Sequence, residues 1–211
     1  MYRLFITRPN RYYCYVRTMI GEQREISECA ECGRKFYSSV KMTDDAFLLI
    51  EGGKKVPDFL DKSQGGLDLY VSSIVIDLFE ANNISGYRVE KEIPLFREVK
   101  KDQFQKVDDA RYYGLTITGK IDFDLKAMHL KKKHVCNSCG RFDWSIQRLS
   151  AIDTKLDMST WNQSDICSVS SSPGHIVCSD KVKNLIDQKK LTGVHIQEEK
   201  DMFRLRYIGE K

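Results

Sequence analysis

Two short cysteine motifs, placed half a chain apart, constrain this sequence more than any other feature. Cys29 and Cys32 form a Cys-x-x-Cys pair followed by glycine, and Cys136 and Cys139 form a second pair, also followed by glycine. Each of these turns, here called a knuckle, can present two thiolates to one metal ion, and two knuckles complete a tetrahedral four-sulfur site. Because 107 positions separate the corresponding cysteines, a shared metal requires a fold that brings distant segments together.

The spacing of 107 positions also relates other residues in the two halves of the chain. Laid on itself at this offset without a gap, the sequence aligns Gly33 with Gly140, Arg34 with Arg141, Asp58 with Asp165, Ser72 with Ser179, Leu78 with Leu185, Gly86 with Gly193, and Phe96 with Phe203. Self-similarity at a fixed period indicates an internal repeat. The sequence therefore predicts a duplication with halves of about 1–107 and 108–211, folded as a single domain over residues 1–211.

Each half is predicted to contain one short helix and a strand that follows it. Apolar residues recur at helical spacing in 72–83 and again in 179–190. Both segments begin at a serine, whose hydroxyl is expected to accept a hydrogen bond from an amide of the first turn. A glycine then opens an alternating segment in each half, which predicts strands over 86–93 and 193–197.

Two hairpins complete the predicted fold. One joins residues 3–7 to residues 12–18, and the other spans residues 112–125 with its turn near Gly119 and Lys120. Short helices packed on antiparallel sheet define an α+β class. We therefore expect two tandem similar halves, each with a knuckle, a short helix and strands, packed as one unit around a shared zinc site.

Structural zinc is the chemistry that the knuckles favour. Four thiolates are expected to hold one Zn²⁺ at Zn–S distances of about 2.3 Å, with no open position for catalysis. A glycine after the second cysteine can adopt a positive φ, which lets backbone amides point at the sulfur. Arg34, Lys35 and Arg141 lie beside the cysteines in the sequence, where positive charge would offset the net negative charge of a four-thiolate zinc site.

Other interpretations of the cysteines stay open. Each pair could be an independent thiol pair or a local disulfide, or it could carry redox chemistry. His134, two positions before Cys136, could replace one sulfur ligand. Zinc-binding pairs are usually separated by about 15 to 20 residues, so these pairs can meet only through the tertiary fold. The lone Cys14, Cys167 and Cys178 lie in apolar surroundings and are predicted core residues.

Composition and motif content restrict the function classes. Lys and Arg exceed Asp and Glu by 34 to 30, an excess too small to indicate nucleic-acid binding by charge alone. No segment reaches the roughly 18 apolar residues of a membrane helix, and no signal-peptide pattern opens the chain, so we expect a cytoplasmic protein without a membrane partner. No catalytic sequence motif occurs, and we expect no enzymatic activity and no catalytic residues.

The two knuckles, far apart in a chain of this length, resemble those of the double-CXXCG motif proteins. In the second half, Cys136-Asn-Ser-Cys-Gly-Arg is followed by Asp165-Ile-Cys, and segments 176–186 and 191–196 are similar to the family's closing strand-helix-strand unit. The likeness covers the knuckles and the final third of the chain. Members of this family are bacterial immunity proteins, encoded beside contact-delivered polymorphic toxins.

The resemblance implies a binding protein that is not an enzyme, works in the cytosol and neutralises a cognate toxin. The alternative is a zinc-ribbon-like nucleic-acid-binding protein, favoured by the basic run 126–134 and by Tyr12, Tyr13 and Tyr15, which could stack on bases. A zinc hydrolase is disfavoured, because the predicted ligands are thiolates alone. The identity of the toxin and the oligomeric state do not follow from the sequence.

Overall fold

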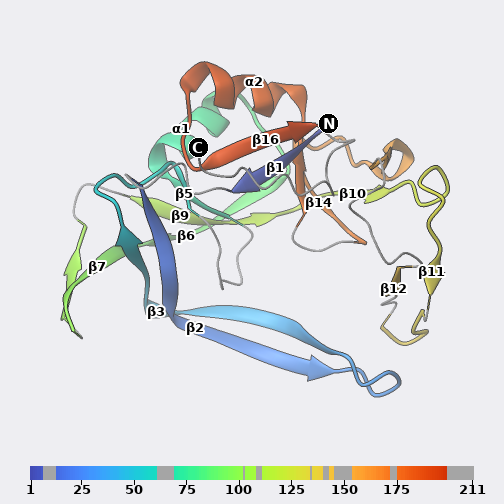
Figure 1. Cartoon of the computed structure of the whole chain (residues 1–211), viewed down its shortest axis with the longest axis horizontal. Coiled ribbons are helices and arrows are strands. Elements are labelled where there is room, and N and C mark those ends of the chain that lie inside the picture. Colours follow the sequence, from blue (N-terminus) through green and yellow to red (C-terminus); the bar gives the residue numbers. More distant parts are fainter. Residues whose placement is uncertain are drawn as a thin grey trace, which may run out of the picture.

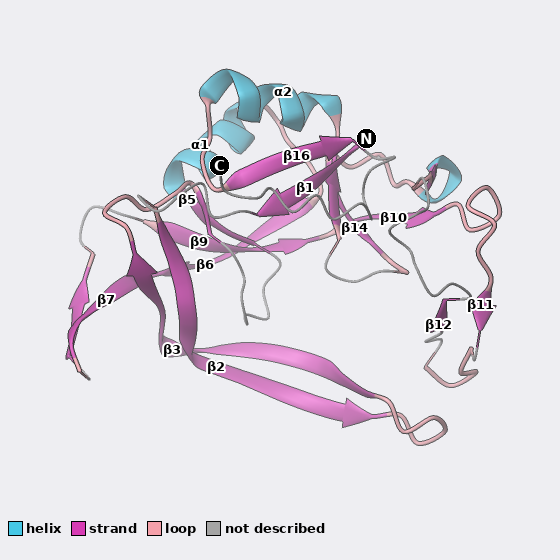
Figure 2. Cartoon of the chain, in the orientation of Figure 1, coloured by secondary structure: helices cyan, strands magenta, loops and turns pink. Residues whose placement is uncertain are grey.

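The computed structural model describes residues 1–6, 13–60, 69–101, 103–107, 111–133, 135–139, 143–144, 154–171 and 175–198. Strands account for most of this part of the chain (Figure 2). In chain order the elements are β1 (Tyr2–Ile6), β2 (Cys14–Glu28), β3 (Lys35–Gly52), β4 (Phe59–Leu60), β5 (Leu69–Ser72), α1 (Ser73–Ala81), β6 (Tyr87–Ile93), β7 (Leu95–Lys100), β8 (Gln103–Lys106), β9 (Tyr112–Ile117), β10 (Gly119–Phe123), β11 (Lys132–Lys133), β12 (Asp143–Trp144), β13 (Leu156–Asp157), the 3-10 turn η2 (Met158–Thr160), β14 (Ile166–Val169), β15 (Ile176–Cys178), α2 (Asp180–Lys189) and β16 (Val194–Glu198).

The predicted α+β class is wrong, because the described chain is mostly β with two α-helices. The first knuckle leads directly into β3, a strand of 18 residues, and not into turns and a helix. The long pair β2 and β3 carries polar residues on both faces along much of its length and contains three register shifts. Polar runs such as 22–25 interrupt the alternation of apolar and polar residues that signals a strand, so the sequence did not indicate a ribbon of this length.

The two predicted helices are confirmed within one or two residues. Helix α1 buries Val75, Ile76 and Phe79, and α2 buries Val182 and Ile186 at two of the equivalent positions, together with Leu185. Both helices lie side by side over the sheets, away from the β2–β3 hairpin (Figure 1). Their apolar faces share one core with Leu4 of β1 and Phe59 of β4, so the two helices and the strands beneath them pack as one body.

Two of the sheets share one hydrogen-bonding plan. In the four-stranded sheet β4-β5-β9-β6, β9 lies between β5 and β6 and is antiparallel to both. In the six-stranded sheet β13-β10-β14-β15-β1-β16, β1 lies in the same way between β15 and β16. Leu115 of β9 pairs with Leu69. The equivalent residue of β1, Leu4, pairs with Ile176, which lies 107 positions after Leu69.

Each sheet takes its inner strand from the other half of the sequence. Strand β9 follows residue 107 but pairs with β5 and β6, and β1 begins the chain but pairs with β15 and β16. The tandem arrangement of two separate halves is therefore wrong. Both predicted hairpins are wrong: β1 pairs with β15 and β16 while β2 pairs with its other neighbour β3, and β9 pairs with β5 and β6 while β10 pairs with β13 and β14.

Two carboxylates join the halves reciprocally at the ends of the helices. The Asp58 carboxylate accepts hydrogen bonds from the backbone amide of Thr192 at 2.8 Å and from its hydroxyl at 2.7 Å. The Asp165 carboxylate accepts from the backbone amide of Ser85 at 3.0 Å and from its hydroxyl at 3.1 Å. Thr192 lies 107 positions after Ser85, as Asp165 does after Asp58, so the two contacts are equivalent across the halves.

The serines that precede the helices form hydrogen bonds with these carboxylates and not with the amides of the helices. Ser72 and Ser179 occupy the N-cap positions, but neither side chain makes a capping hydrogen bond. Instead the Ser72 hydroxyl donates to Asp58 at 3.3 Å, and the Ser179 hydroxyl donates to Asp165 at 2.8 Å. The expected capping role is therefore corrected: the tertiary fold directs each hydroxyl toward a carboxylate, and its oxygen accepts no hydrogen bond from the first turn of the helix.

The glycines after the helices allow the two halves to approach each other closely. Gly86 has a φ of 95° and Gly193 a φ of 82°, a region that residues with a Cβ rarely adopt. A Cβ on Gly86 would lie 2.1 Å from the carbonyl oxygen of Ile166, and one on Gly193 would lie 2.0 Å from that of Phe59. Glycine is required at both positions by conformation and by space.

Candidate metal centre

The first knuckle is the turn at the tip of the β2–β3 hairpin (Figure 1). Its backbone closes on itself: the Cys29 amide donates to the Arg34 carbonyl at 3.0 Å, and the Gly33 amide donates to the Cys29 carbonyl at 2.8 Å. Gly33 has a φ of 67°, so the positive φ predicted after the second cysteine is confirmed. The corresponding Gly140 lies outside the described residues.

The second knuckle, residues 136–139, lies between the short paired strands β11 and β12. A hydrogen bond links it to the first knuckle, because the Ser138 amide donates to the Glu31 carboxylate at 3.0 Å. These two residues are again separated by 107 positions. Sequence reasoning missed this contact, although the repeat register aligns Glu31 with Ser138. The fold therefore brings together two hairpin ends that are distant in the sequence.

The four sulfur atoms form a compact cluster with the size of a tetrahedral metal site. All four Sγ atoms of Cys29, Cys32, Cys136 and Cys139 lie within 4.8 Å of one another. The Cys29–Cys136 sulfurs are 3.6 Å apart, and the Cys32–Cys139 sulfurs are 3.8 Å apart. Four sulfurs at about 2.3 Å from a central zinc would be separated by about 3.8 Å. The group could therefore hold a metal ion without rearrangement of the backbone.

The same distances exclude disulfides between these cysteines. A disulfide bond needs sulfurs about 2.05 Å apart, and all four cysteines are free. One cysteine of each knuckle is nearly inaccessible, since Cys29 is 6% exposed and Cys136 is 5% exposed. Cys32 is exposed and Cys139 is intermediate. The cluster therefore has a dry inner side, where two sulfurs face the protein, and an outer side near the solvent.

The surroundings of the cluster favour the thiolate form of Cys29, the inner cysteine of the first knuckle. Hydrogen bonds from the backbone amides of Cys32 and Glu31 lower the pKa of Cys29 to about 6. The Cys139 amide favours the Cys136 thiolate in the same way, but burial and the neighbouring sulfurs outweigh it and raise the pKa of Cys136 to about 12. A divalent cation would stabilise several thiolates at once. Its binding would therefore remove the energetic cost of deprotonating neighbouring cysteines together.

Basic and acidic side chains surround the first knuckle. Lys35 lies 3.8 Å from the Glu28 carboxylate, and both side chains are largely exposed. Among the described residues, the group that could hold a metal contains the four cysteines and no histidine. His134 and Arg141, which sequence reasoning placed beside the second knuckle, lie outside the described residues.

The other sequence candidates are dispersed. In the basic run 126–134, Met128 and Leu130 are buried in a core cluster with β10 and β14, so this run is partly a core segment. Cys167 and Cys178 are fully buried, and burial raises their pKa values to about 11 and 12. Their predicted core role is confirmed, whereas the side chain of Cys14 lies outside the described part.

Comparison with known proteins finds no match, either among family models or among curated sequences. Among the described residues, no helix combines the length and the apolar character needed to cross a membrane. The chemistry of the chain must therefore be inferred from its own residues, and the four-cysteine cluster is the group that points to a specific ligand.

Proposed function

We propose that Cys29, Cys32, Cys136 and Cys139 bind one zinc ion and that the chain is an immunity protein, which neutralises a cognate bacterial toxin by binding it. The observation that carries the metal proposal is the sulfur cluster itself, with separations of 3.6 and 3.8 Å across the two knuckles. Zinc is favoured over other metals because four thiolates in a tetrahedron suit it, and because it brings no redox chemistry to the site.

The role of this zinc is structural. Thiolates occupy all four tetrahedral positions, so no position is left for a catalytic water or a substrate. The ion would fasten the tip of the β2–β3 hairpin to the β11–β12 hairpin, which otherwise meet through the hydrogen bond between Glu31 and Ser138. A fastened hairpin presents a rigid surface, and rigidity lowers the entropic cost of binding a partner.

The immunity function is supported by the two knuckles and the closing strand-helix-strand segments, which resemble those of the double-CXXCG motif proteins. A protein of this kind acts through a surface and needs no catalytic group. Such binding also suits a fold that is held by reciprocal contacts on both sides and is therefore stiff. The proposed partner is the product of a toxin gene adjacent to the gene for this chain.

The test is neutralisation of that toxin in cells. The adjacent reading frame is expressed under an inducible promoter, with and without the full chain, and growth is measured. The proposal expects rescue by the chain and a stable complex of the two purified proteins on size-exclusion chromatography. An absence of both rescue and complex contradicts the immunity function. Salt-dependent binding of generic duplex DNA by the purified protein at physiological ionic strength would instead favour the nucleic-acid function.

A further inference from the structure

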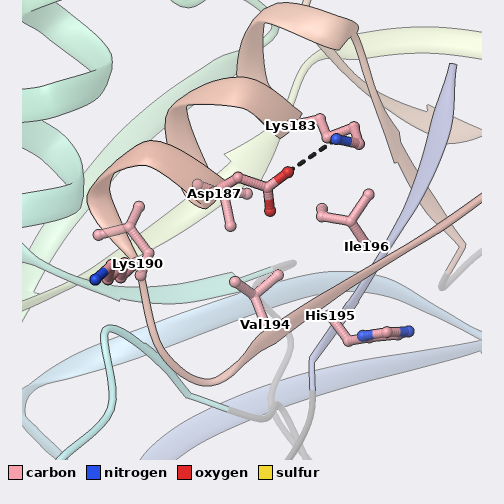
Figure 3. Close-up of a pocket in the computed structure, with 8 residues that line it drawn as sticks. Lys183, Asp187, Lys190, Val194, His195 and Ile196 are labelled. Atoms are coloured by element: carbon pink, nitrogen blue, oxygen red, sulfur yellow. Dashed lines mark hydrogen bonds and ion pairs between the residues drawn. The ribbon is translucent and has the colours of Figure 1, made fainter.

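A cavity of about 380 Å³ lies between helix α2 and strand β16. Its floor is apolar and comes from Ile186, Leu191, Val194 and Ile196, and its rim carries charged side chains of the helix. Figure 3 shows Val194 and Ile196 directed toward the helix, with Lys183 and Asp187 above them and Lys190 to the left, at the end of the helix. The volume lies at the small end of the range for ligand pockets. Polar side chains, His195 among them, make up half of the lining residues, so the cavity is apolar at its floor and polar around it.

The equivalent place in the first half is filled by an aromatic pair. The register of 107 positions relates Ile186 to Phe79 and Val194 to Tyr87. The rings of Phe79 and Tyr87 are 5.5 Å apart at an angle of 59°, a favourable packing for aromatic side chains. Phe79 is fully buried there. Two smaller aliphatic residues take these positions in the second half, and both line the cavity.

The rim differs between the halves in charge as well. Ile76, which is buried in the first half, is replaced by Lys183. The Lys183 ammonium is 2.8 Å from the Asp187 carboxylate, so these two charges compensate each other. Lys190 lines the same cavity, adjacent to Lys189 in the last turn of α2. The rim therefore carries a net positive charge, which would attract a partner with acidic groups.

We propose that this cavity receives a tyrosine or phenylalanine side chain of the toxin, from a segment whose neighbouring residues are acidic. The aromatic ring would take the position that Tyr87 takes in the first half and would pack on Ile186 and Val194. The acidic neighbours would face Lys190. This inference rests on the proposed function, because it assigns the chemistry of the partner's contact surface. Buried aromatic anchors in pockets of this kind provide much of the affinity of protein interfaces.

A peptide probe tests the cavity directly. Full-length zinc-loaded protein with labelled methyl groups is titrated with N-acetyl-Glu-Tyr-Glu-amide and, as control, with N-acetyl-Glu-Leu-Glu-amide, and methyl chemical shifts are followed. The tyrosine peptide is expected to shift the methyl signals of Val194 and Ile196 but not that of Val89, the equivalent of Ile196. The leucine peptide should bind about tenfold more weakly, because its smaller side chain leaves part of the cavity empty.

Two variants separate shape from charge. Val194→Tyr reproduces the first half and should abolish the shifts at Ile196, while Lys190→Glu keeps the cavity and should weaken the peptide about tenfold. Equal binding of both peptides, or no shifts at Val194 and Ile196, overturns the inference. So does a nuclear Overhauser contact between these methyl groups and the ring of Phe203, because the chain would then fill its own cavity.

The toxin assay distinguishes this inference from the proposed function. If Val194→Tyr folds, binds zinc and no longer neutralises the toxin while the wild-type chain does, the inference is supported. If Val194→Tyr neutralises as well as the wild type, the inference fails and the immunity function stands. If the wild-type chain does not neutralise, the immunity function fails, and the assignment of the cavity to the toxin fails with it, even where the tyrosine peptide binds.

Discussion

The two helix–strand junctions of this protein share their contacts at one end and differ at the other. Where α1 and α2 begin and β6 and β16 start, the same carboxylate, hydroxyl and glycine recur in both halves. Between each helix and its strand, however, the first half packs Phe79 against Tyr87, and the second half leaves a cavity beside Val194. The groups that fix the backbone are the same in both halves, whereas side chains that lie between each helix and its strand differ.

The hairpins that carry the knuckles show the same contrast. Strands β2 and β3 have 15 and 18 residues, whereas β11 and β12 have two residues each in the described part of the chain. Both hairpins nevertheless deliver one buried and one more accessible cysteine to the cluster. The proposed metal site requires a local turn from each hairpin and a fold that brings the two turns together. It does not depend on the length of the strands that lead to the turns.

The largest expected effect comes from removing a cysteine of the four-sulfur cluster, to which each half of the chain contributes two residues. Cys29→Ser and Cys136→Ser should each abolish stoichiometric zinc binding and lower the free energy of unfolding by about 4–5 kcal/mol, the amount expected for opening a crosslink that closes a loop of about 100 residues. Denaturant unfolding with metal analysis measures both. Ser138→Ala, a change beside a ligand that leaves the backbone amide in place, is the control and should keep the metal. Unchanged stability of the metal-free variants would contradict a structural role.

Alanine at either glycine tests whether the two junctions are equivalent. Gly86→Ala and Gly193→Ala should each cost at least about 3 kcal/mol, because the new Cβ meets a carbonyl oxygen and φ is positive. The two losses should agree within about 1 kcal/mol in urea unfolding. Ser85→Ala, next to Gly86, should cost less than either. Tolerance of one alanine and not the other would show that the junctions are not equivalent.

The Asp165 junction gives a pH-dependent prediction. Burial is the largest influence and raises the pKa of Asp165, but hydrogen bonds from Ser179 and Ser85 and the charge of Lys181 outweigh it, so the net pKa is lowered. A lowered folded-state pKa contributes stability above the unfolded pKa of about 3.9, and this contribution is lost as the pH falls through the folded value.

Asp165→Asn should therefore reduce stability by about 2 kcal/mol at neutral pH, the order expected for hydrogen bonds to a charged group. The difference between the wild type and the variant should shrink below about pH 4. Urea unfolding across this pH range measures it. A difference that stays constant down to the acid limit would mean that the charge of Asp165 does not contribute.

The smallest effects should come from exchanging the residues that differ between the halves. Tyr87→Val should cost about 1–2 kcal/mol, because it removes a ring packed on buried Phe79. Val194→Tyr should change stability by less than about 1 kcal/mol, because the ring enters space that is already open. Thermal unfolding of the two variants side by side measures this asymmetry. A loss at Val194 as large as that at Tyr87 would argue against an open cavity in the second half.

Short-range structural features were predictable from the sequence, whereas the pairing of strands was not. The knuckles, the two helices and the glycines before β6 and β16 are short-range patterns, and the structure contains them where the sequence indicates. The partners of β1 and β9 lie far away in the chain, and hydrophobic alternation carries no information about which strand is adjacent. The predicted hairpins of β1 with β2 and of β9 with β10 were therefore wrong, although β2 and β3, also neighbours in sequence, do form one.

Two other errors have specific physical causes. The role of Ser72 and Ser179 was misassigned because the carboxylates to which their hydroxyls donate, Asp58 and Asp165, precede them by 14 positions, and the approach of these carboxylates depends on the tertiary fold. The cavity beside Val194 had no signal in any motif. It could have been found by comparing the two halves in the 107-residue register. Tyr87 aligns with the smaller Val194, and a large residue aligned with a small one marks a place where packing must differ.

We propose that one zinc ion joins the two knuckles through four sulfurs. X-ray absorption at the zinc edge, combined with metal analysis of the protein purified without added zinc, measures both the number of ions and their ligands. We expect one zinc per chain, with four sulfur neighbours at about 2.3 Å and no nitrogen or oxygen in the inner shell. Two zinc ions per chain, a mixed sulfur and nitrogen shell, or an absence of metal with full stability would contradict it.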